Sequence, residues 1–161
     1  MPLLDRRFTL LAILALAGCG FAPVYGPGGP AGKLRGAVLA DAPNNRAEYV
    51  LVRRIEERLG FPTTPRYRLA AAIRVGEEGV GITPEQVTTR YTLRGRVDWR
   101  LLDISTGAQL AAGRAESATG YAATATTVAT RTAREDARDR LMVILSDRIV
   151  TDLLSRADTW P

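Results

Sequence analysis

Arginine supplies most of the side chains in this sequence that could bind a charged ligand. The chain has 22 basic residues, and since Lys33 is the only lysine, 21 of them are arginines. Seven of these follow an every-second-residue pattern in two segments: Arg66, Arg68 and Arg74 in the first, and Arg90, Arg94, Arg96 and Arg100 in the second. The planar guanidinium group forms paired hydrogen bonds with phosphate or carboxylate. If the two segments are neighbouring strands, they present one basic face.

This face has two interpretations. As a functional surface, it would bind phosphates, an acidic glycolipid or the polar wall of a partner protein. The candidate binding residues are Arg90, Arg94, Arg96, Arg66 and Arg68. As an ordinary solvated sheet face, the arginines would instead form ion pairs with acidic neighbours such as Asp98 and Glu116. Nucleic acid is not expected as a partner, because the aromatic residues of these segments lie on the opposite, apolar face.

The sequence lacks residues that the most common catalytic mechanisms need. The sequence has no histidine and one cysteine, Cys19, so neither a histidine-based relay nor a usual transition-metal site can be built. We therefore predict no catalytic residue, no metal site and no cofactor. A lipid-anchored enzyme working through Asp, Glu, Ser or Arg alone is the alternative from a different class.

The first 19 residues have the order of an export signal. Arg6 and Arg7 precede an apolar stretch from Phe8 to Leu16, and small residues lead to Cys19. The apolar stretch is about ten residues, half of the roughly 20 that a membrane-spanning helix needs. Leu-Ala-Gly-Cys at residues 16–19 resembles the lipobox of bacterial lipoproteins. We predict a signal peptide over residues 1–18, removed before Cys19, which then carries N-palmitoyl and S-diacylglycerol groups.

Residues 19–32 are predicted to form the lipidated cysteine and a flexible tether, because Gly and Pro dominate this segment. Several acyl chains on one residue suffice for stable membrane anchoring. Gly20 replaces the Asp that is typical of inner-membrane retention, which favours the outer membrane, with the protein on its periplasmic side. Residues 33–161 are predicted to form a single domain.

The first part of this domain reads as a strand followed by a helix. Residues 33–40 are a candidate edge strand. Asn45 followed by Glu48 is typical of a helix start, and apolar residues then repeat at helical spacing as far as Leu59. Gly60 and Pro62 end this helix.

After this helix, apolar residues recur at every second position, which predicts three antiparallel strands. In residues 66–75 and 88–103, large apolar side chains recur at every second position with mostly polar or small residues between them, and residues 76–87 are predicted to form a connecting loop. Residues 103–107 form a turn into a weaker strand over residues 109–119.

A long helix is predicted over residues 127–156, with Thr132 and Glu135 as a capping pair and an apolar stripe that includes Leu141, Leu145 and Ile149. Helices and sheet each have one apolar face. The predicted fold is therefore α+β: a two-layer sandwich with a mainly antiparallel sheet of about four strands, two helices packed on one face, and the order β-α-β-β-β-α.

The residues that follow the lipobox carry a family resemblance. Cys19 to Tyr25 read Cys-Gly-Phe-Ala-Pro-Val-Tyr. This run, together with the order of elements, resembles the lipopolysaccharide (LPS)-assembly lipoproteins of the LptE (RlpB-type) family, whose mature region commonly begins in this way. The resemblance implies an outer-membrane lipoprotein that forms a complex with the LptD β-barrel, supports barrel assembly and binds LPS during delivery, without catalysis. The alternative is a lipoprotein accessory subunit of another envelope lipid transporter.

Overall fold

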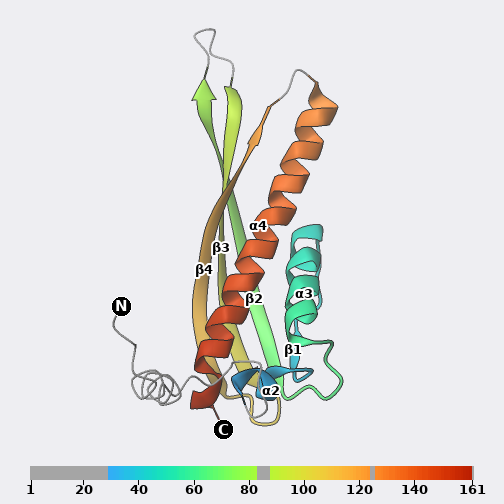
Figure 1. The fold of residues 1–161 in the computed structure, drawn as a ribbon, viewed down its shortest axis with the longest axis vertical. Coiled ribbons are helices and arrows are strands. Elements are labelled where there is room, and N and C mark those ends of the chain that lie inside the picture. Colours follow the sequence, from blue (N-terminus) through green and yellow to red (C-terminus); the bar gives the residue numbers. More distant parts are fainter. Residues whose placement is uncertain (1–28, 83–87, 124–125, 161) are drawn as a thin grey trace, which may run out of the picture.

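Three long strands form the body of the sheet in the computed structural model, which describes residues 29–82, 88–123 and 126–160. They are β2 (Tyr67–Ile82), β3 (Thr88–Asp103) and β4 (Gln109–Ala122), each antiparallel to the next (Figure 1). The turn after Asp103 is as predicted: the Asp103 carboxylate accepts the backbone N–H groups of Ser105 and Thr106, and Gly107 has φ 71°. A positive φ of this kind favours glycine.

β2 is longer than the sequence predicts. Residues 76–82, predicted as part of a loop, continue the strand and pair with β3, for example Gly76 with Arg94 and Gly79 with Tyr91. That prediction is wrong because pairing along the full length of β3 overrides the weak strand propensity of Gly and Glu. The rest of the predicted loop, residues 83–87, lies outside the described residues.

The start of the domain also differs from the prediction. Residues Pro30–Leu34 form a short helix, α2, where the end of the tether and the start of an edge strand were predicted. Pro30 occupies the first turn of this helix, a position that tolerates proline because its missing N–H has no helical partner there. The strand itself, β1, is confined to Val38–Ala40 and runs parallel to β2, giving the sheet order β1-β2-β3-β4.

The helix α3 (Arg46–Leu59) is confirmed at both ends. The Asn45 side chain accepts the N–H of Glu48 at 3.0 Å, and Gly60, with φ 84°, ends the helix. The long helix α4 (Thr127–Arg156) has the predicted bounds, but a different cap. Thr126, not Thr132, accepts an N–H of the first turn, whereas the Thr132 hydroxyl donates to a carbonyl within the helix.

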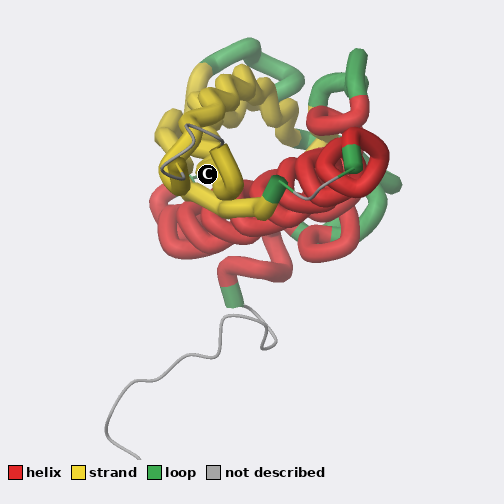
Figure 2. Tube along the Cα trace, turned by 90° about the horizontal axis from the view of Figure 1, so that it is seen from above, coloured by secondary structure: helices red, strands yellow, loops and turns green. Residues whose placement is uncertain are grey.

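The two long helices form one layer and the sheet the other, which confirms the α+β class and the element order. α4 crosses β3 and β4, and α3 packs against α4, with α2 as a third, short helix at the lower end (Figure 1). Viewed along the long axis, the sheet is curved and the helices lie along one side of it (Figure 2). The apolar alternation is confirmed on this covered side, where Tyr67, Leu93, Val97, Trp99 and Leu101 are buried.

The lower end of the molecule is closed by contacts between segments far apart in sequence. α2 packs against α4 and against a final 3-10 turn, η1 (Ala157–Thr159). Leu34 is fully buried, the Tyr67 and Trp160 rings meet edge to face at 6.2 Å, and Lys33 Nζ donates to the Trp160 carbonyl at 3.4 Å. Among the described residues, no helix is both long enough and apolar enough to span a membrane.

Candidate binding surface

The face of the sheet turned away from the helices carries the arginines predicted from the sequence. The register places Arg74 of β2 opposite Arg96 of β3, and Arg114 of β4 opposite Asp98. In a pleated sheet, every second residue of each strand shares this side. We call this the open face. Its arginines are Arg68, Arg74, Arg90, Arg94, Arg96, Arg100 and Arg114, and its acidic residues are Glu78, Asp98 and Glu116.

Asp98 organises the centre of the open face. Its carboxylate accepts hydrogen bonds from Arg114 at 2.8 Å and Arg96 at 3.0 Å, and Arg74 lies 3.6 Å away. Hydrogen bonds from Arg114, then from Arg96, lower the pKa of the Asp98 carboxyl group. One carboxylate thus holds guanidinium groups from three strands, and the ion-pairing interpretation describes this part of the face correctly.

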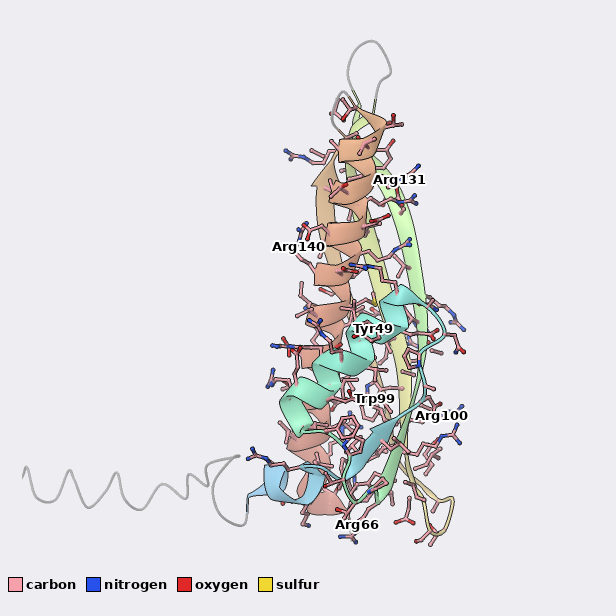
Figure 3. All side chains as sticks on the ribbon, turned by 90° about the vertical axis from the view of Figure 1, so that its right-hand side faces the viewer. Tyr49, Arg66, Trp99, Arg100, Arg131 and Arg140 are labelled. Atoms are coloured by element: carbon pink, nitrogen blue, oxygen red, sulfur yellow. The ribbon has the colours of Figure 1, made fainter. Side chains whose placement is uncertain are left out.

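The predicted arginines fall into separate groups along the strands. Arg94 pairs with Glu78 at 3.4 Å, and Arg68 donates to Asp41 at 2.6 Å, which raises the pKa of Arg68. Arg66 precedes β2 at the lower end of the molecule, where its guanidinium lies 5.7 Å from the centre of the Tyr67 ring (Figure 3). It therefore does not join Arg90 and Arg94, which lie near the opposite end of β3.

Two arginines of the open face, Arg90 and Arg100, have no hydrogen bond or ion pair with any described residue. The Arg100 side chain points away from the sheet in Figure 3. Exposure separates the paired arginines as well: the side chain of Arg94 is 70% exposed, against 37% for Arg96. Arg90 and Arg94 are thus both exposed, whereas Arg96 between Arg94 and Asp98 is only partly so.

The helix α4 contributes an arginine that the sequence did not single out. Arg148 donates to the carbonyl of Glu116 on β4, and with Arg94 and Arg96 it lines a shallow depression beside that strand. Nothing in the linear spacing of α4 indicates which strand an outward-facing arginine reaches. The pairing of the helix with the sheet has to be known first.

Apolar side chains are exposed on the helical layer. Tyr49 of α3 and Ile144 of α4 lie in a groove between the two helices, and Arg46, Arg53 and Arg140 are part of its lining (Figure 3). Arg46 also forms a paired contact with Asp139 of α4, 2.6 Å at its shorter bond. This groove was not predicted, because it depends on how α3 packs beside α4.

No group of three or more potential metal ligands exists among the residues that the structure describes. The predicted lipidation site, Cys19, lies outside them. The candidate functional site within the described residues is therefore the open face.

Together, fold and surface define a class of protein: a small α+β domain whose helices cover one side of a curved sheet and whose other side is an arginine-rich face. Residues 35–153 match the family described as LptE, lipopolysaccharide-assembly, so the chain belongs to this family. The family comprises non-catalytic accessory lipoproteins of LPS transport, which agrees with the predicted absence of an enzymatic role. The chain is thus an LPS-assembly lipoprotein of the bacterial envelope.

Solved structures share this fold. A Caulobacter crescentus protein described as a lipoprotein aligns over 84% of this chain and 100% of its own length, with 24% identity and a TM-score of 0.69. Rare lipoprotein B from Shewanella oneidensis covers 76% of this chain and 96% of its own, with 12% identity and a TM-score of 0.58. A minor lipoprotein from Acinetobacter baumannii covers 74% and 90%, with 15% identity and a TM-score of 0.54. No curated protein matches the sequence.

Proposed function

We propose that this chain is an outer-membrane lipoprotein, anchored through acyl groups on Cys19 at the periplasmic side, that forms a complex with an LptD-type β-barrel. In this role it supports assembly of the barrel and binds LPS during its delivery to the outer leaflet. The observation that carries the proposal is the arginine-rich open face on a member of the LptE family.

The chemistry of the open face suits both partners. Lipid A carries phosphate groups, and guanidinium groups bind phosphate through short, charge-assisted hydrogen bonds. The lumen of an outer-membrane barrel is polar, so a charged face can lie against it without a large desolvation cost. Arg90 and Arg94 are the best candidates for phosphate contacts, because neither is held by a strong ion pair within the described part of the chain.

Co-purification from detergent-solubilised membranes tests the complex. We expect a large β-barrel protein to be recovered with the full-length lipidated chain in a defined stoichiometry. Recovery of subunits of an ABC-type lipid transporter instead would favour the alternative of an accessory subunit in another envelope system. Recovery of neither would count against both assignments.

Binding of purified LPS tests the open face separately. The double variant R90A/R94A should weaken LPS binding by about 10-fold or more, because two charge-assisted hydrogen-bonding groups are removed. The matched control is R53A/R140A, which removes the same charge from the helical layer, where Arg53 pairs with Glu57 and Arg140 with Asp136. Titration with fluorescently labelled LPS provides the measurement. Equal binding by the two double variants would show that the open face is only a solvated surface.

A further inference from the structure

The upper part of β2 forms an edge of the sheet that no other strand covers within the described part of the chain. β1 pairs only with residues 67–69, and β3 occupies the other side of β2. On the β1 side, Tyr67 N–H donates to the Ala37 carbonyl, and the Leu69 carbonyl accepts the Asp41 N–H at 3.0 Å. The main-chain groups of odd-numbered residues thus point toward this edge.

The same alternation continues above β1. Ala71, Ile73, Val75 and Glu77 turn their N–H and C=O groups outward before the irregularity between Gly79 and Gly81. No hydrogen bond from a described residue reaches these groups. We call residues 71–77 the β2 edge.

The opposite edge of the sheet is protected in a way that the β2 edge is not. On β4, the outward carbonyls of Ala112 and Glu116 accept hydrogen bonds from Arg156 and Arg148 of α4. Natural proteins commonly cover or charge an edge strand, because its unpaired main-chain groups attract another strand. Of the two edges, the β2 edge is therefore the one whose main-chain groups can pair with another strand.

A cavity with both apolar and polar lining residues lies beside the β2 edge. It measures about 130 Å³ and lies between α3, which contributes Leu51 and Ile55, and β2, which contributes Ala71 and Ile73. Polar residues of the lining are Asp41, Asn44 and Glu48. An engineered cavity of about 150 Å³ holds a benzene ring, so this volume suits one aliphatic or small aromatic side chain. Bound strands gain affinity from main-chain hydrogen bonds and specificity from pockets that receive alternate side chains.

Arg74, on the opposite side of β2 from the cavity, indicates which charge a strand paired with the β2 edge should carry. Arg74 faces the open side, its side chain is 71% exposed, and its contact with Asp98 is 3.6 Å long. Asp98 already accepts shorter bonds from Arg96 and Arg114. A carboxylate on a neighbouring strand would be a better partner for Arg74, since opposite charges across strands stabilise pairing.

We infer that the β2 edge is the docking site for an extended segment of a partner protein, which adds a fifth strand to the sheet. The segment places an apolar side chain in the cavity beside Ile73 and an acidic side chain, on its other face, next to Arg74. This inference rests on the proposed function, because the β-barrel partner supplies the segment.

Amide hydrogen exchange distinguishes an open edge from a paired one. In the isolated full-length chain, the outward amides of Ile73, Val75 and Glu77 should exchange quickly. Those of Ala72 and Arg74, which face β3, should exchange slowly and serve as an internal control. In the purified complex, the outward amides should slow by at least about 10-fold, because strand pairing removes them from solvent. Fast exchange at these three amides in an intact complex would overturn the inference.

A proline substitution tests the same edge by a second route. Val75→Pro removes only an outward N–H, and proline is tolerated at the solvent side of an edge strand. The variant lacks this donor, and the proline ring keeps a partner strand from approaching closely. The amount of barrel protein that co-purifies with a given amount of lipoprotein should therefore fall by about 10-fold. Val75→Ala, which keeps the N–H, should retain the barrel.

The outcomes separate the two proposals. If the wild-type chain recovers no barrel, the proposed function fails and the inference falls with it. If wild-type, Val75→Ala and folded Val75→Pro chains recover equal amounts, only the docking site is overturned. Should Val75→Pro fail to fold, the wild-type exchange pattern decides. Slow outward amides in the isolated chain, together with a dimeric mass, would assign the edge to a second copy of this protein and overturn the partner segment.

Discussion

Glu77 links three elements at the upper end of the molecule. Its carboxylate accepts a hydrogen bond from the Tyr121 hydroxyl of β4 at 2.5 Å and one from Arg134 of α4 at 2.7 Å. The Tyr121 ring in turn stacks on Tyr91 of β3, with 5.1 Å between ring centres. Burial, together with the bond to Glu77, raises the pKa of Tyr121 to about 12, so the hydroxyl stays a donor across the physiological range.

Stability should depend on the charge of Glu77. Burial raises the pKa of its carboxyl group, but the hydrogen bonds from Tyr121 and Arg134 outweigh burial, and the net pKa is lowered. A lowered folded-state pKa stabilises the protein above the unfolded value of about 4.3, and this contribution is lost as the pH falls through the folded-state pKa. Glu77→Gln should therefore lower the free energy of unfolding by about 1–2 kcal/mol at pH 7, and by much less near pH 3.

Urea unfolding at pH 7, 4.5 and 3 measures this effect. Glu78→Gln is the control, because Glu78 is 62% exposed on the open face and its pair with Arg94 should contribute less than about 0.5 kcal/mol. An equal loss for Glu77→Gln at all three pH values would show that the loss does not come from the charge of Glu77.

At the scale of residues, the sequence predicts contacts within the sheet better than contacts between layers. Arg96 and Asp98 are two positions apart on one strand, so their shared face follows from alternation alone. The sequence predicts a loop at Glu77, whose partners lie 44 and 57 residues away on β4 and α4. No local pattern carries information about such partners.

At the scale of elements, one glycine sets how closely helix and sheet approach. A Cβ atom added at Gly95 of β3 would lie 2.8 Å from side-chain carbons of Leu141 and Leu145 on α4. Both leucines are fully buried, so neither can move aside without disturbing the core. The absence of a side chain at Gly95 lets the helix pack directly onto the strand.

Gly95→Ala should therefore destabilise the protein by about 1–3 kcal/mol through overpacking. Gly76→Ala is the matched control on β2: an added Cβ meets nothing within 4 Å, and this glycine does not have a positive φ. It should be neutral or stabilise by up to about 1 kcal/mol, because alanine restricts the unfolded chain. Thermal and denaturant melts compare the two, and an undisturbed Gly95→Ala variant would mean that α4 can shift on the sheet.

Element bounds were predictable where local signals are strong and were missed where long-range contacts decide. Asn45 and Gly60 fix α3 through side-chain and backbone geometry that depends on neighbours in sequence. The extension of β2 through Gly76 and the helix at Pro30–Leu34 depend instead on β3, and on α4 and η1, respectively. Such contacts override weak local propensity.

At the scale of the whole molecule, the two long helices run in parallel and are joined by ion pairs in register. Arg54 and Arg58 of α3 both bond to Asp147 of α4, at 3.0 and 2.7 Å. Burial raises the pKa of Asp147, but the hydrogen bond and charge of Arg54, with those of Arg58, lower it overall. This arrangement places α3 beside β1, and on that side the upper part of β2 has no neighbouring strand among the described residues (Figure 1).

The two ends of the molecule lie at different distances from the proposed lipid anchor at Cys19. The described chain begins just before α2, which packs against η1 near the C-terminus. The start of β3, which includes Arg90, and the start of α4 lie at the other end (Figure 1). From Cys19 to Gly29 the fully extended chain would span about 36 Å at most. Under the proposed anchoring, the α2 end therefore stays near the membrane surface, and the end with Arg90 can extend farther from it.

Membrane attachment in this arrangement depends on the acyl groups of Cys19. Each CH₂ group of an acyl chain that is buried in the membrane contributes about 0.8 kcal/mol. A single acyl group of myristoyl length therefore gives only marginal membrane binding, whereas several acyl groups hold a protein stably. Cys19→Ala should therefore leave an uncleaved precursor that is not sorted to the outer membrane. Mass spectrometry of the purified chain and separation of inner and outer membranes measure both effects. Normal processing with normal outer-membrane retention of Cys19→Ala would contradict the lipoprotein anchor, and with it the orientation argued from α2.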